Sequence, residues 1–515
     1  MYDLTGSRTL RDLLDERTAR HPGKTWLVVE SADGAVREWT YAEFTTRVDA
    51  LARGLADLGV GPGERVTVHL RNCAEIVEMW FALATLGAVF VPSNVANTAS
   101  ELRHVLDRSG AVLLVVGADY VEVVEKAVTQ DLPALRHIAT VGSAAPEVAD
   151  WLRLDDLRAS GAVPSAGVRA DDVVEMIFTS GTTARPKGVL LTHANALYGG
   201  EQAARALHLD SSDRLLTPLP IFHVNAQVCT VLAALTVGGT CIVLEEYRAT
   251  RFWDQVRAHR ATEVGLVAML ARTLLAQPPR ETDREHDLRR VFYALNISQE
   301  ERDRFEERFG VELLNGYGLS EAMTLVTLAP VFGPKRWPSI GLPLDDRVIR
   351  LVDEDGQDVP HGEVGEIIVR GRPGRTVMLG YHNDPAATAE ALRDGWLHTG
   401  DNAYADDRGY LYFFDRAKDM IKRAGENVSS AEVEAALLEH PEIEEAAVIG
   451  VPDPVRDEAV KAFIVPVEGK TLTEDAVIAF CRENLARFKV PTILEFRTEL
   501  PKTSVGKIEK KTLRG

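Results

Sequence analysis

The strongest constraint on the fold is a regular alternation between helical and strand-like spacing of apolar residues, which begins near residue 40. In the first segment these residues recur at the spacing of one helix face: Phe44, Val48, Leu51, Leu55 and Leu58. Residues 65–70 are apolar at every second position, as in a strand. The alternation continues through a helix-like segment at 76–86 and apolar runs at 89–91 and 112–116. Helices between buried strands favour β-α-β units, so we expect an α/β fold with mostly parallel sheets.

Changes of composition divide this long chain into parts. Residues 142–171 are rich in Ala, Gly, Ser, Pro and acids, which indicates a surface connection before a new sheet and a lobe boundary. After residues 415–419 the pattern becomes that of a small α+β unit. Within it, residues 429–432 (Ser-Ser-Ala-Glu) have capping-box spacing and are expected to open a helix. We predict a large, multi-lobed N-terminal domain, 1–417, and a small C-terminal domain, 418–515.

Composition argues against several classes of protein. The formal net charge of −19 is unsuited to nucleic-acid binding or to peripheral membrane binding, because both usually need a basic surface. The cysteines lie far apart, without metal-binding or paired spacing: Cys73, Cys229, Cys241 and Cys481. No apolar run approaches the ~18 residues of a membrane span, and the N-terminus has no export signal. We therefore expect a cytoplasmic protein without a membrane span.

A loop rich in hydrogen-bond donors follows the strand-like residues 173–178. It reads Thr179-Ser180-Gly181-Thr182-Thr183-Ala184-Arg185-Pro186-Lys187-Gly188. Its backbone N–H groups, its hydroxyls and its lysine can together cradle a polyphosphate. The residues expected to do so are Thr179, Ser180, Gly181, Thr182, Thr183 and Lys187. A solvated turn is the plain alternative. The loop is not a Walker A motif, because Lys187 lies between proline and glycine.

This loop and later segments resemble, in order, the motifs of the adenylate-forming superfamily, which includes acyl-CoA synthetases, adenylation domains of non-ribosomal peptide synthetases and luciferases. The later segments are Asn315-Gly316-Tyr317-Gly318-Leu319-Ser320-Glu321, Trp396-Leu397-His398-Thr399-Gly400-Asp401, Asp415-Arg416-Ala417-Lys418 and Pro501-Lys502-Thr503-Ser504-Val505-Gly506-Lys507. Each alone also fits a turn, a surface ion pair or a solvated lysine. Together they span the chain from residue 179 to residue 507, which makes chance a poor explanation.

The resemblance implies nucleotide contacts for the first of these later segments. Tyr317 would stack on adenine, Ser320 would contact phosphate, and Glu321 would act in catalysis by holding Mg²⁺. Asn315 and Gly318 belong to the same binding segment.

The remaining motifs would complete the site. Asp401 and Arg416 would bind the ribose, a task that suits a carboxylate because it accepts two hydrogen bonds from a diol. Lys507 would be catalytic, reaching the reacting carboxylate and the α-phosphate. Lys418 would be the hinge between the domains.

The implied reaction uses ATP, Mg²⁺ and coenzyme A. By the same resemblance, the N-terminal domain, 1–417, would bind ATP and the acyl group, and the C-terminal domain, 418–515, would be mobile. A carboxylate that attacks the α-phosphate brings two anions together, so the site must supply cations and donors. The acyl-adenylate formed with release of pyrophosphate would then be captured by the thiol of coenzyme A. Between the steps the small domain would rotate about Lys418, withdraw Lys507 and bring residues 423–427, with Gly425, to the pantetheine channel. A turn leading into a helix is the plain alternative for Gly425.

Further segments are similar to the bacterial crotonobetaine/carnitine-CoA ligases: residues 178–183, 185–189, 336–341 and 421–429. The acid does not follow from this similarity. A quaternary ammonium group favours a carboxylate or an aromatic cage. The expected pocket wall at 220–227 contains no acid and one benzene-type ring, Phe222.

We therefore expect a hydrophobic acid, with large alicyclic or terpenoid acids included because several pocket residues are small. The expected pocket residues are Asn225, Ala226, Val264, Gly265, Ala268 and Leu295. His223 matches a residue near the reacting carboxylate and is expected to be catalytic, although a lone histidine is more often structural.

Two alternatives to an acyl-CoA ligase stay open at this stage. One is an enzyme that passes the acyl group to an acyl carrier protein or a partner enzyme. The other is a non-catalytic regulator that binds nucleotides or acyl groups. The charged residues of the motifs argue against a regulator: Lys187, Glu321, Asp401, Arg416 and Lys507. The sequence does not distinguish a monomer from a homodimer.

Overall fold

The computed structural model describes residues 4–129, 132–142, 148, 150–179, 186–294, 297–416, 420–467, 469–501, 508 and 510–514. Several predicted site residues lie outside these ranges: Ser180, Gly181, Thr182, Thr183, Leu295, Lys418 and Lys507.

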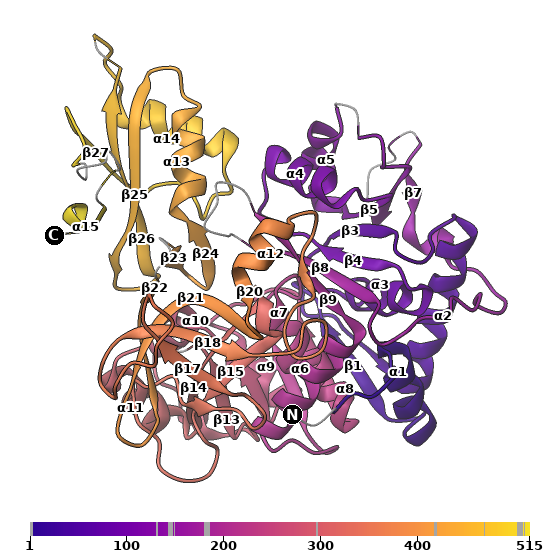
Figure 1. Ribbon diagram of the computed structural model, residues 1–515. Helices are drawn as coiled ribbons and strands as arrows, with labels where there is room; N and C mark the ends of the chain where they lie inside the picture. Colours follow the sequence, from indigo (N-terminus) through magenta and orange to yellow (C-terminus); the bar gives the residue numbers. More distant parts are fainter. Residues whose placement is uncertain are drawn as a thin grey trace.

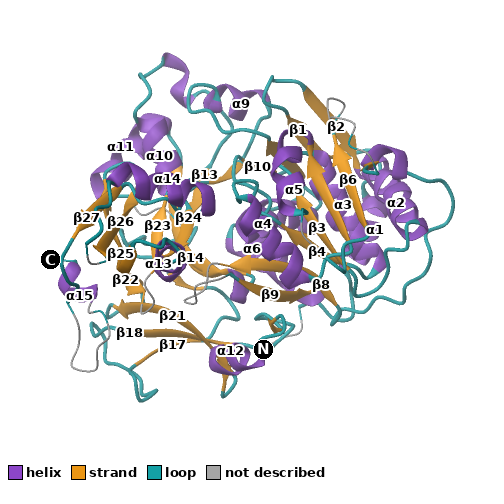
Figure 2. Ribbon diagram, turned by 90° about the horizontal axis from the view of Figure 1, so that it is seen from above, coloured by secondary structure: helices purple, strands orange, loops and turns teal. Residues whose placement is uncertain are grey.

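The first lobe is built on a mainly parallel sheet of order β19-β9-β8-β4-β3-β5-β6-β7. Its strands are β3 (Arg65–His69), β4 (Val89–Pro92), β5 (Leu113–Gly117), β6 (His137–Val141), β7 (Leu152–Arg153), β8 (Val173–Thr179), β9 (Lys187–Thr192) and β19 (Gly380–Tyr381). Its helices are α1 (Leu10–Arg20), α2 (Tyr41–Asp57), α3 (Ala74–Leu86), α4 (Ala99–Ser109) and α5 (Val121–Ala127). Figure 2 shows α2 and α3 on one side of β3 and β4, with α4 and α5 on the other.

The second lobe carries a sheet of order β16-β15-β14-β13-β12-β10-β11-β1-β2. Its strands are β1 (Thr25–Glu30), β2 (Val36–Thr40), β10 (Arg214–Thr217), β11 (Thr240–Leu244), β12 (Glu263–Gly265), β13 (Arg290–Tyr293), β14 (Glu312–Leu319), β15 (Thr324–Leu328) and β16 (Leu342–Pro343). Its helices are α6 (His193–Ala206), α7 (Val224–Ala226), α8 (Ala233–Val237), α9 (Phe252–Ala258), α10 (Ala268–Leu275) and α11 (Gln299–Phe309), with a π-helical segment over Gln227–Leu232.

The two sheets share a core through the helices between them. Trp26 of β1 lies 4.4 Å from the ring of Phe44 on α2 and 5.8 Å from that of Phe81 on α3. On the far side of α3, the Trp80 ring stacks 5.9 Å from Phe90 of β4. One apolar cluster therefore joins both lobes.

A third, antiparallel sheet completes the N-terminal part, with order β17-β18-β21-β20 and β22 paired to β21. Its elements are β17 (Ile349–Val352), β18 (Gly365–Arg370), α12 (Pro385–Ala391), β20 (Leu392–Arg393), β21 (Trp396–Ala405) and β22 (Leu411–Arg416).

The C-terminal domain has its own sheet, of order β24-β23-β26-β25 with β27 paired to β26 (Figure 1, yellow). Its elements are β23 (Met420–Arg423), β24 (Glu426–Ser429), α13 (Ser430–Leu438), β25 (Ile443–Asp453), β26 (Asp457–Pro466), α14 (Glu474–Asn484), β27 (Ile493–Phe496) and α15 (Lys510–Leu513). Its apolar clusters begin at Ile421, whereas the main N-terminal cluster reaches Leu411. The predicted fold class is confirmed. The division between residues 417 and 418 stays a prediction, because residues 417–419 lie outside the described ranges.

Local predictions had mixed outcomes. The start of α13 is confirmed, because the Ser429 hydroxyl accepts a hydrogen bond from the backbone N–H of Glu432 at 3.3 Å. The lobe boundary expected at 142–171 is wrong. This segment connects β6 to β8 by way of β7, and β8 pairs with β4 in the same sheet. Sequence composition marked a surface connection but not the sheet to which the chain returns. None of the described helices is long and apolar enough to cross a membrane.

Candidate active site

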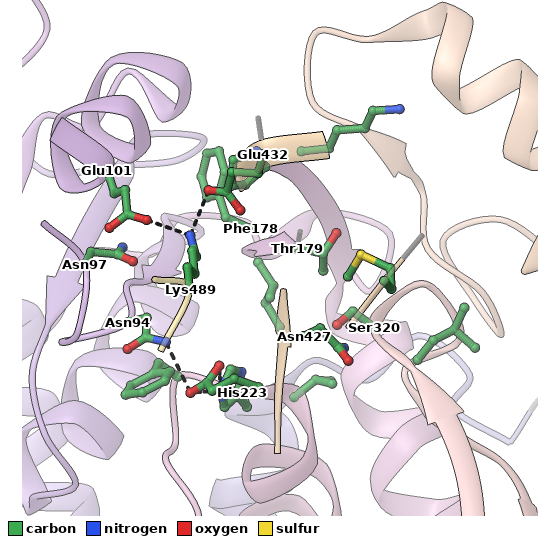
Figure 3. Close-up of a pocket in the computed structure, with 18 of the residues that line it drawn as sticks. Asn94, Asn97, Glu101, Phe178, Thr179, His223, Ser320, Asn427, Glu432 and Lys489 are labelled. Atoms are coloured by element: carbon green, nitrogen blue, oxygen red, sulfur yellow. Dashed lines mark hydrogen bonds and ion pairs between the residues drawn. The ribbon is translucent and has the colours of Figure 1, made fainter. Parts of the chain in front are cut away.

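A cavity of about 1010 Å³ lies where both lobes, the third sheet and the C-terminal domain meet (Figure 3). Several predicted site residues line it: Thr179, Lys187, His223, Asn225, Gly318, Ser320, Glu321, Asp401 and Gly425. Others are buried without being among its lining residues: Asn315, Tyr317, Ala226, Val264, Gly265 and Ala268. Arg416 ends β22, where its backbone pairs with that of Asp401.

A lysine, a tyrosine and a glutamate form one wall of the cavity. The Lys187 ammonium lies 5.2 Å from the ring centroid of Tyr381, whose hydroxyl donates to Glu321 Oε1 at 2.9 Å. Burial, together with the neighbouring Glu321 charge, raises the pKa of the Tyr381 phenol and keeps it a donor. Sequence reasoning missed Tyr381. Its position depends on β19 pairing with β9, opposite Val189, which no motif indicated.

Glu321 lies in a tightly constrained turn at the end of β14. A Cβ on Gly318 would overlap the backbone carbonyl of Thr324, so only glycine fits there. Met323 and Thr324 have φ values of 47° and 104°, and a positive φ is unusual for a β-branched residue. Such backbone outliers are concentrated at functional sites. This turn directs Ser320 and Glu321 to the cavity.

The predicted ribose-binding residue is buried beside the predicted adenine-binding residue. The Tyr317 hydroxyl donates to Asp401 Oδ2 at 2.7 Å, and the Asp401 N–H donates to Thr399 Oγ1 at 3.1 Å. The Asn315 amide donates to the carbonyls of Pro338 and Ser339 at 3.3 and 3.1 Å. Asn315 therefore stabilises the loop after β15 through these hydrogen bonds.

The β23–β24 hairpin brings the C-terminal domain to the cavity. Its turn consists of Ala424 and Gly425, with φ values of 55° and 87°, the sign pattern of a type I′ turn. A Cβ on Gly425 would lie 3.1 Å from Val267 Cγ2. The helix-approach alternative for Gly425 is wrong, because the residue joins two strands.

The next residue of the hairpin joins the domains through polar contacts. Glu426 Oε1 accepts from His223 Nε2 at 3.2 Å and from Asn94 Nδ2 at 3.3 Å (Figure 3). Burial opposes protonation of His223, but the Glu426 charge and hydrogen bond outweigh it and raise the pKa of His223. Burial likewise opposes ionisation of Glu426, and the His223 charge outweighs it and lowers the pKa of Glu426. Both shifts favour a charged pair.

A buried lysine forms a second bridge between the domains. Lys489 is 5% exposed, and its Nζ lies 2.7 Å from Glu101 Oε1 on α4 and 2.7 Å from Glu432 Oε1 on α13 (Figure 3). Burial would lower the pKa of Lys489, but the two carboxylates outweigh it and raise that pKa. Sequence reasoning missed this cluster, since Glu101 and Lys489 are 388 residues apart.

The described residues can help to hold Mg²⁺ but do not form a complete metal cage. Among them there is no group of three or more His, Cys, Asp or Glu side chains suited to a metal ion. A single carboxylate, Glu321, fits magnesium because proteins usually hold that ion by one or two carboxylates together with substrate phosphates.

One part of the cavity lining is mainly apolar. Its wall comprises Phe222, Val224, Val267, Met269 and Leu270, with His223 and Asn225 as polar members. Glu426, which meets this wall at His223, is already engaged by His223 and Asn94.

Comparison with known proteins identifies the family. The profile of the AMP-binding enzyme family matches residues 14–382, and that of the AMP-binding enzyme C-terminal domain matches residues 432–507. A crotonobetaine/carnitine–CoA ligase of Salmonella agona (strain SL483) is 40% identical over 516 residues, covering 99% of this chain and 100% of its own.

Solved structures of related enzymes have the same architecture. A double mutant of o-succinylbenzoate CoA synthetase (MenE) from Bacillus subtilis, bound to a product analogue, gives a TM-score of 0.85 at 27% identity, covering 99% of this chain and 98% of its own. The amide bond synthetase McbA from Marinactinospora thermotolerans gives 0.85 at 28% identity, covering 97% and 99%. The chain therefore belongs to the AMP-binding enzyme family of adenylate-forming enzymes, as an AMP-forming acyl-CoA synthetase.

Proposed function

We propose that this acyl-CoA synthetase activates a hydrophobic carboxylic acid and transfers it to coenzyme A. The observation that carries the proposal is one cavity lined by several of the predicted nucleotide-binding residues, by an apolar wall and by the C-terminal hairpin. Adenylation requires the nucleotide-binding residues and the apolar wall. Thioester formation also requires a path by which coenzyme A can reach the acyl group.

In the first step a carboxylate oxygen of the acid forms a bond to the α-phosphorus of ATP, and the bond to pyrophosphate breaks. Thr179, Lys187 and Ser320 line the cavity and can neutralise or donate to phosphate oxygens. Glu321 would hold Mg²⁺, which supplies positive charge to the phosphates when bound. Lys507 would steady the acid against the α-phosphate, and Asp401 and Arg416 would bind the ribose.

In the second step the thiol sulfur of coenzyme A forms a bond to the acyl carbon, its proton goes to solvent or a base, and AMP leaves with the electron pair of the broken bond. The hairpin contact with His223 supports assigning the observed domain arrangement to this step. Rotation about Lys418 would interchange this arrangement with one in which Lys507 reaches the cavity.

The wall chemistry favours a neutral, hydrophobic acyl group over a quaternary ammonium one. Phe222 is the benzene-type ring of the wall, and the nearby Glu426 carboxylate is committed to His223 and Asn94. A cationic headgroup usually needs an aromatic cage or an available carboxylate. Alicyclic and terpenoid acids are therefore included in the proposed class, although the Salmonella relative bears the name of a crotonobetaine/carnitine–CoA ligase.

Pyrophosphate exchange with a panel of acids tests the proposal. The panel contains linear, alicyclic and terpenoid acids together with carnitine and crotonobetaine, each with and without Mg²⁺. We expect exchange with hydrophobic acids at a higher kcat/KM than with the two ammonium acids. The reverse order would contradict the substrate class, and a complete lack of exchange would favour a regulator.

Mass spectrometry of the product then separates the acceptors. A thioester formed with coenzyme A alone supports the ligase. An acyl-adenylate that is consumed only when an acyl carrier protein or partner enzyme is added favours carrier loading. Gel filtration with light scattering would decide between a monomer and a homodimer, and fractionation would test the proposed cytoplasmic location.

Two variants test whether the C-terminal domain acts differently in the two half-reactions. Lys507→Ala should abolish adenylation while preserving thioester formation from supplied acyl-adenylate, because its role belongs to the first step. Lys418→Pro should restrict the hinge and spare adenylation. Equal loss of both steps in both variants would contradict domain rotation.

A further inference from the structure

Asn225 is a buried polar side chain in the apolar wall of the cavity. It is the second residue of α7, is 5% exposed and lines the cavity. No hydrogen-bond acceptor among the described residues lies within reach of its Nδ2. Burying an amide N–H without a partner is unfavourable, and such groups are rare in folded proteins.

Other buried asparagines of the N-terminal lobes are satisfied by the fold. Asn72 donates to the carbonyls of Leu219 and Leu244 at 2.9 Å each and accepts from the N–H of Ile221 at 2.8 Å. Asn195 donates to the carbonyl of Val377 at 2.9 Å. Asn72 therefore shows what a structural asparagine looks like here, and Asn225 differs from it.

The surroundings leave the amide of Asn225 without a competing partner. A Cβ built on Gly265 would lie 3.5 Å from Asn225 Oδ1, so the amide lies beside a glycine, which has no side chain to offer it a hydrogen bond. The terminal torsion of asparagine is broad, so an amide that no hydrogen bond holds can turn its N–H toward a group in the cavity.

We propose that Asn225 is a specificity-determining residue that donates a hydrogen bond to an oxygen on the acyl group of the substrate. This inference rests on the proposed function and narrows its substrate class. The acid has a largely apolar skeleton that carries one carbonyl or hydroxyl oxygen apart from the reacting carboxylate. A site that pairs such an oxygen discriminates against the analogue that lacks it, because the buried N–H is then left unpaired.

The test compares acids that differ by one oxygen. The probes are cyclohexanecarboxylate with its 3-oxo, 4-oxo, 3-hydroxy and 4-hydroxy derivatives, and hexanoate with 5-oxohexanoate. Pyrophosphate exchange gives kcat/KM for each, and the readout is the ratio of oxygenated acid to parent within one protein. This ratio does not depend on how much of a variant is folded.

The wild type should prefer at least one oxygenated acid to its parent by about tenfold or more. Asn225→Leu should bring that ratio to about one by losing the donor. Asn225→Asp keeps the size, but its ionised carboxylate oxygens can only accept hydrogen bonds, so this variant should retain a hydroxy acid, which can donate, and reject the oxo acid. Asn72→Leu is the control, and it should lower thermal stability without changing the ratio.

The outcomes separate this inference from the proposed function. A wild type that exchanges with the parent acids but prefers no oxygenated partner overturns the inference and leaves the proposed function standing. A ratio unchanged in Asn225→Leu also overturns it, as does an equal loss for every acid, which would place Asn225 on the reacting carboxylate. Exchange with no acid at all would overturn the proposed function itself.

Discussion

At the residue scale, the hydrogen bond from Tyr317 to Asp401 gives a direct test of the buried polar site. Tyr317→Phe removes the 2.7 Å hydrogen bond, so Asp401 Oδ2 loses this donor. Hydrogen bonds to charged groups contribute about 1.5–3 kcal/mol, so the free energy of unfolding should fall by about that amount. Denaturant unfolding measures it. Tyr412→Phe, which removes a weaker 3.3 Å contact to Asp406, is the control and should have a smaller effect.

The His223–Glu426 pair predicts a pH dependence with a definite sign. The pKa of His223 is raised and that of Glu426 is lowered in the folded protein, so the pair contributes fully between about pH 4.5 and about pH 6.5; its contribution is lost as pH rises through the raised pKa of His223 or falls through the lowered pKa of Glu426. Glu426→Gln should lower the pKa of His223, because burial then acts without the opposing charge. Titration of carbon-13-labelled histidines by NMR measures this. His69, whose pKa burial lowers to about 4, is the internal reference and should not move.

Single residues also show where sequence reasoning stops. Glu321 and Asp401 could be proposed because they lie in contiguous motifs, and both line the cavity. Tyr381 and Lys489 lie in no such motif, and their positions depend on strand pairing and domain contact. Asn315 was expected at the nucleotide, whereas its amide donates to Pro338 and Ser339. A motif specifies residue types but not which neighbour takes each hydrogen bond.

At the element scale, the β23–β24 turn tests whether the hairpin acts in thioester formation. Gly425→Ala places a methyl group about 3.1 Å from Val267 Cγ2 at a φ of 87°. The close contact and the positive φ both disfavour the observed position of the hairpin against Val267. The left-handed backbone alone costs roughly 1 kcal/mol for an alanine. Stopped-flow assays should show slower thioester formation and unchanged adenylation.

Ala424→Gly is the matched control in the same turn. Its φ of 55° suits glycine better than alanine, so this variant should retain both half-reactions. If both turn variants lose thioester formation equally, the contact with Val267 is not the cause.

Elements with strong periodicity were the most predictable part of the fold. The helix inferred from Phe44 to Leu58 corresponds to α2, and the alternating residues 65–70 to β3. The hairpin at Ala424 and Gly425 was not recognised, because alanine rarely adopts a positive φ and no Asn-Gly or Asp-Gly pair marks the turn. The return of β8 to its sheet depends on long-range pairing, which local composition does not encode.

At the scale of the whole molecule, the Lys489 bridge should contribute to the attachment of the C-terminal domain. Lys489→Met leaves the buried Glu432 and the partly buried Glu101 without their cation. Breaking a buried pair in this way costs about 3–5 kcal/mol, and we expect a lower Tm. Adding Glu101→Gln and Glu432→Gln should restore most of the loss. Lys126→Met, which breaks an exposed pair with Glu122, should have almost no effect.

The contact of the β23–β24 hairpin with the cavity affects the turnover rate. If the C-terminal domain rotates about Lys418 in every cycle, the contacts of Glu426 with His223 and Asn94 must break and re-form once per product molecule. Movement of a whole domain is opposed by solvent friction, whereas bond formation inside a closed cavity is not, and such motions limit many enzymes. Domain rotation would then limit the turnover rate, and added glycerol would lower that rate in proportion to the viscosity of the solution.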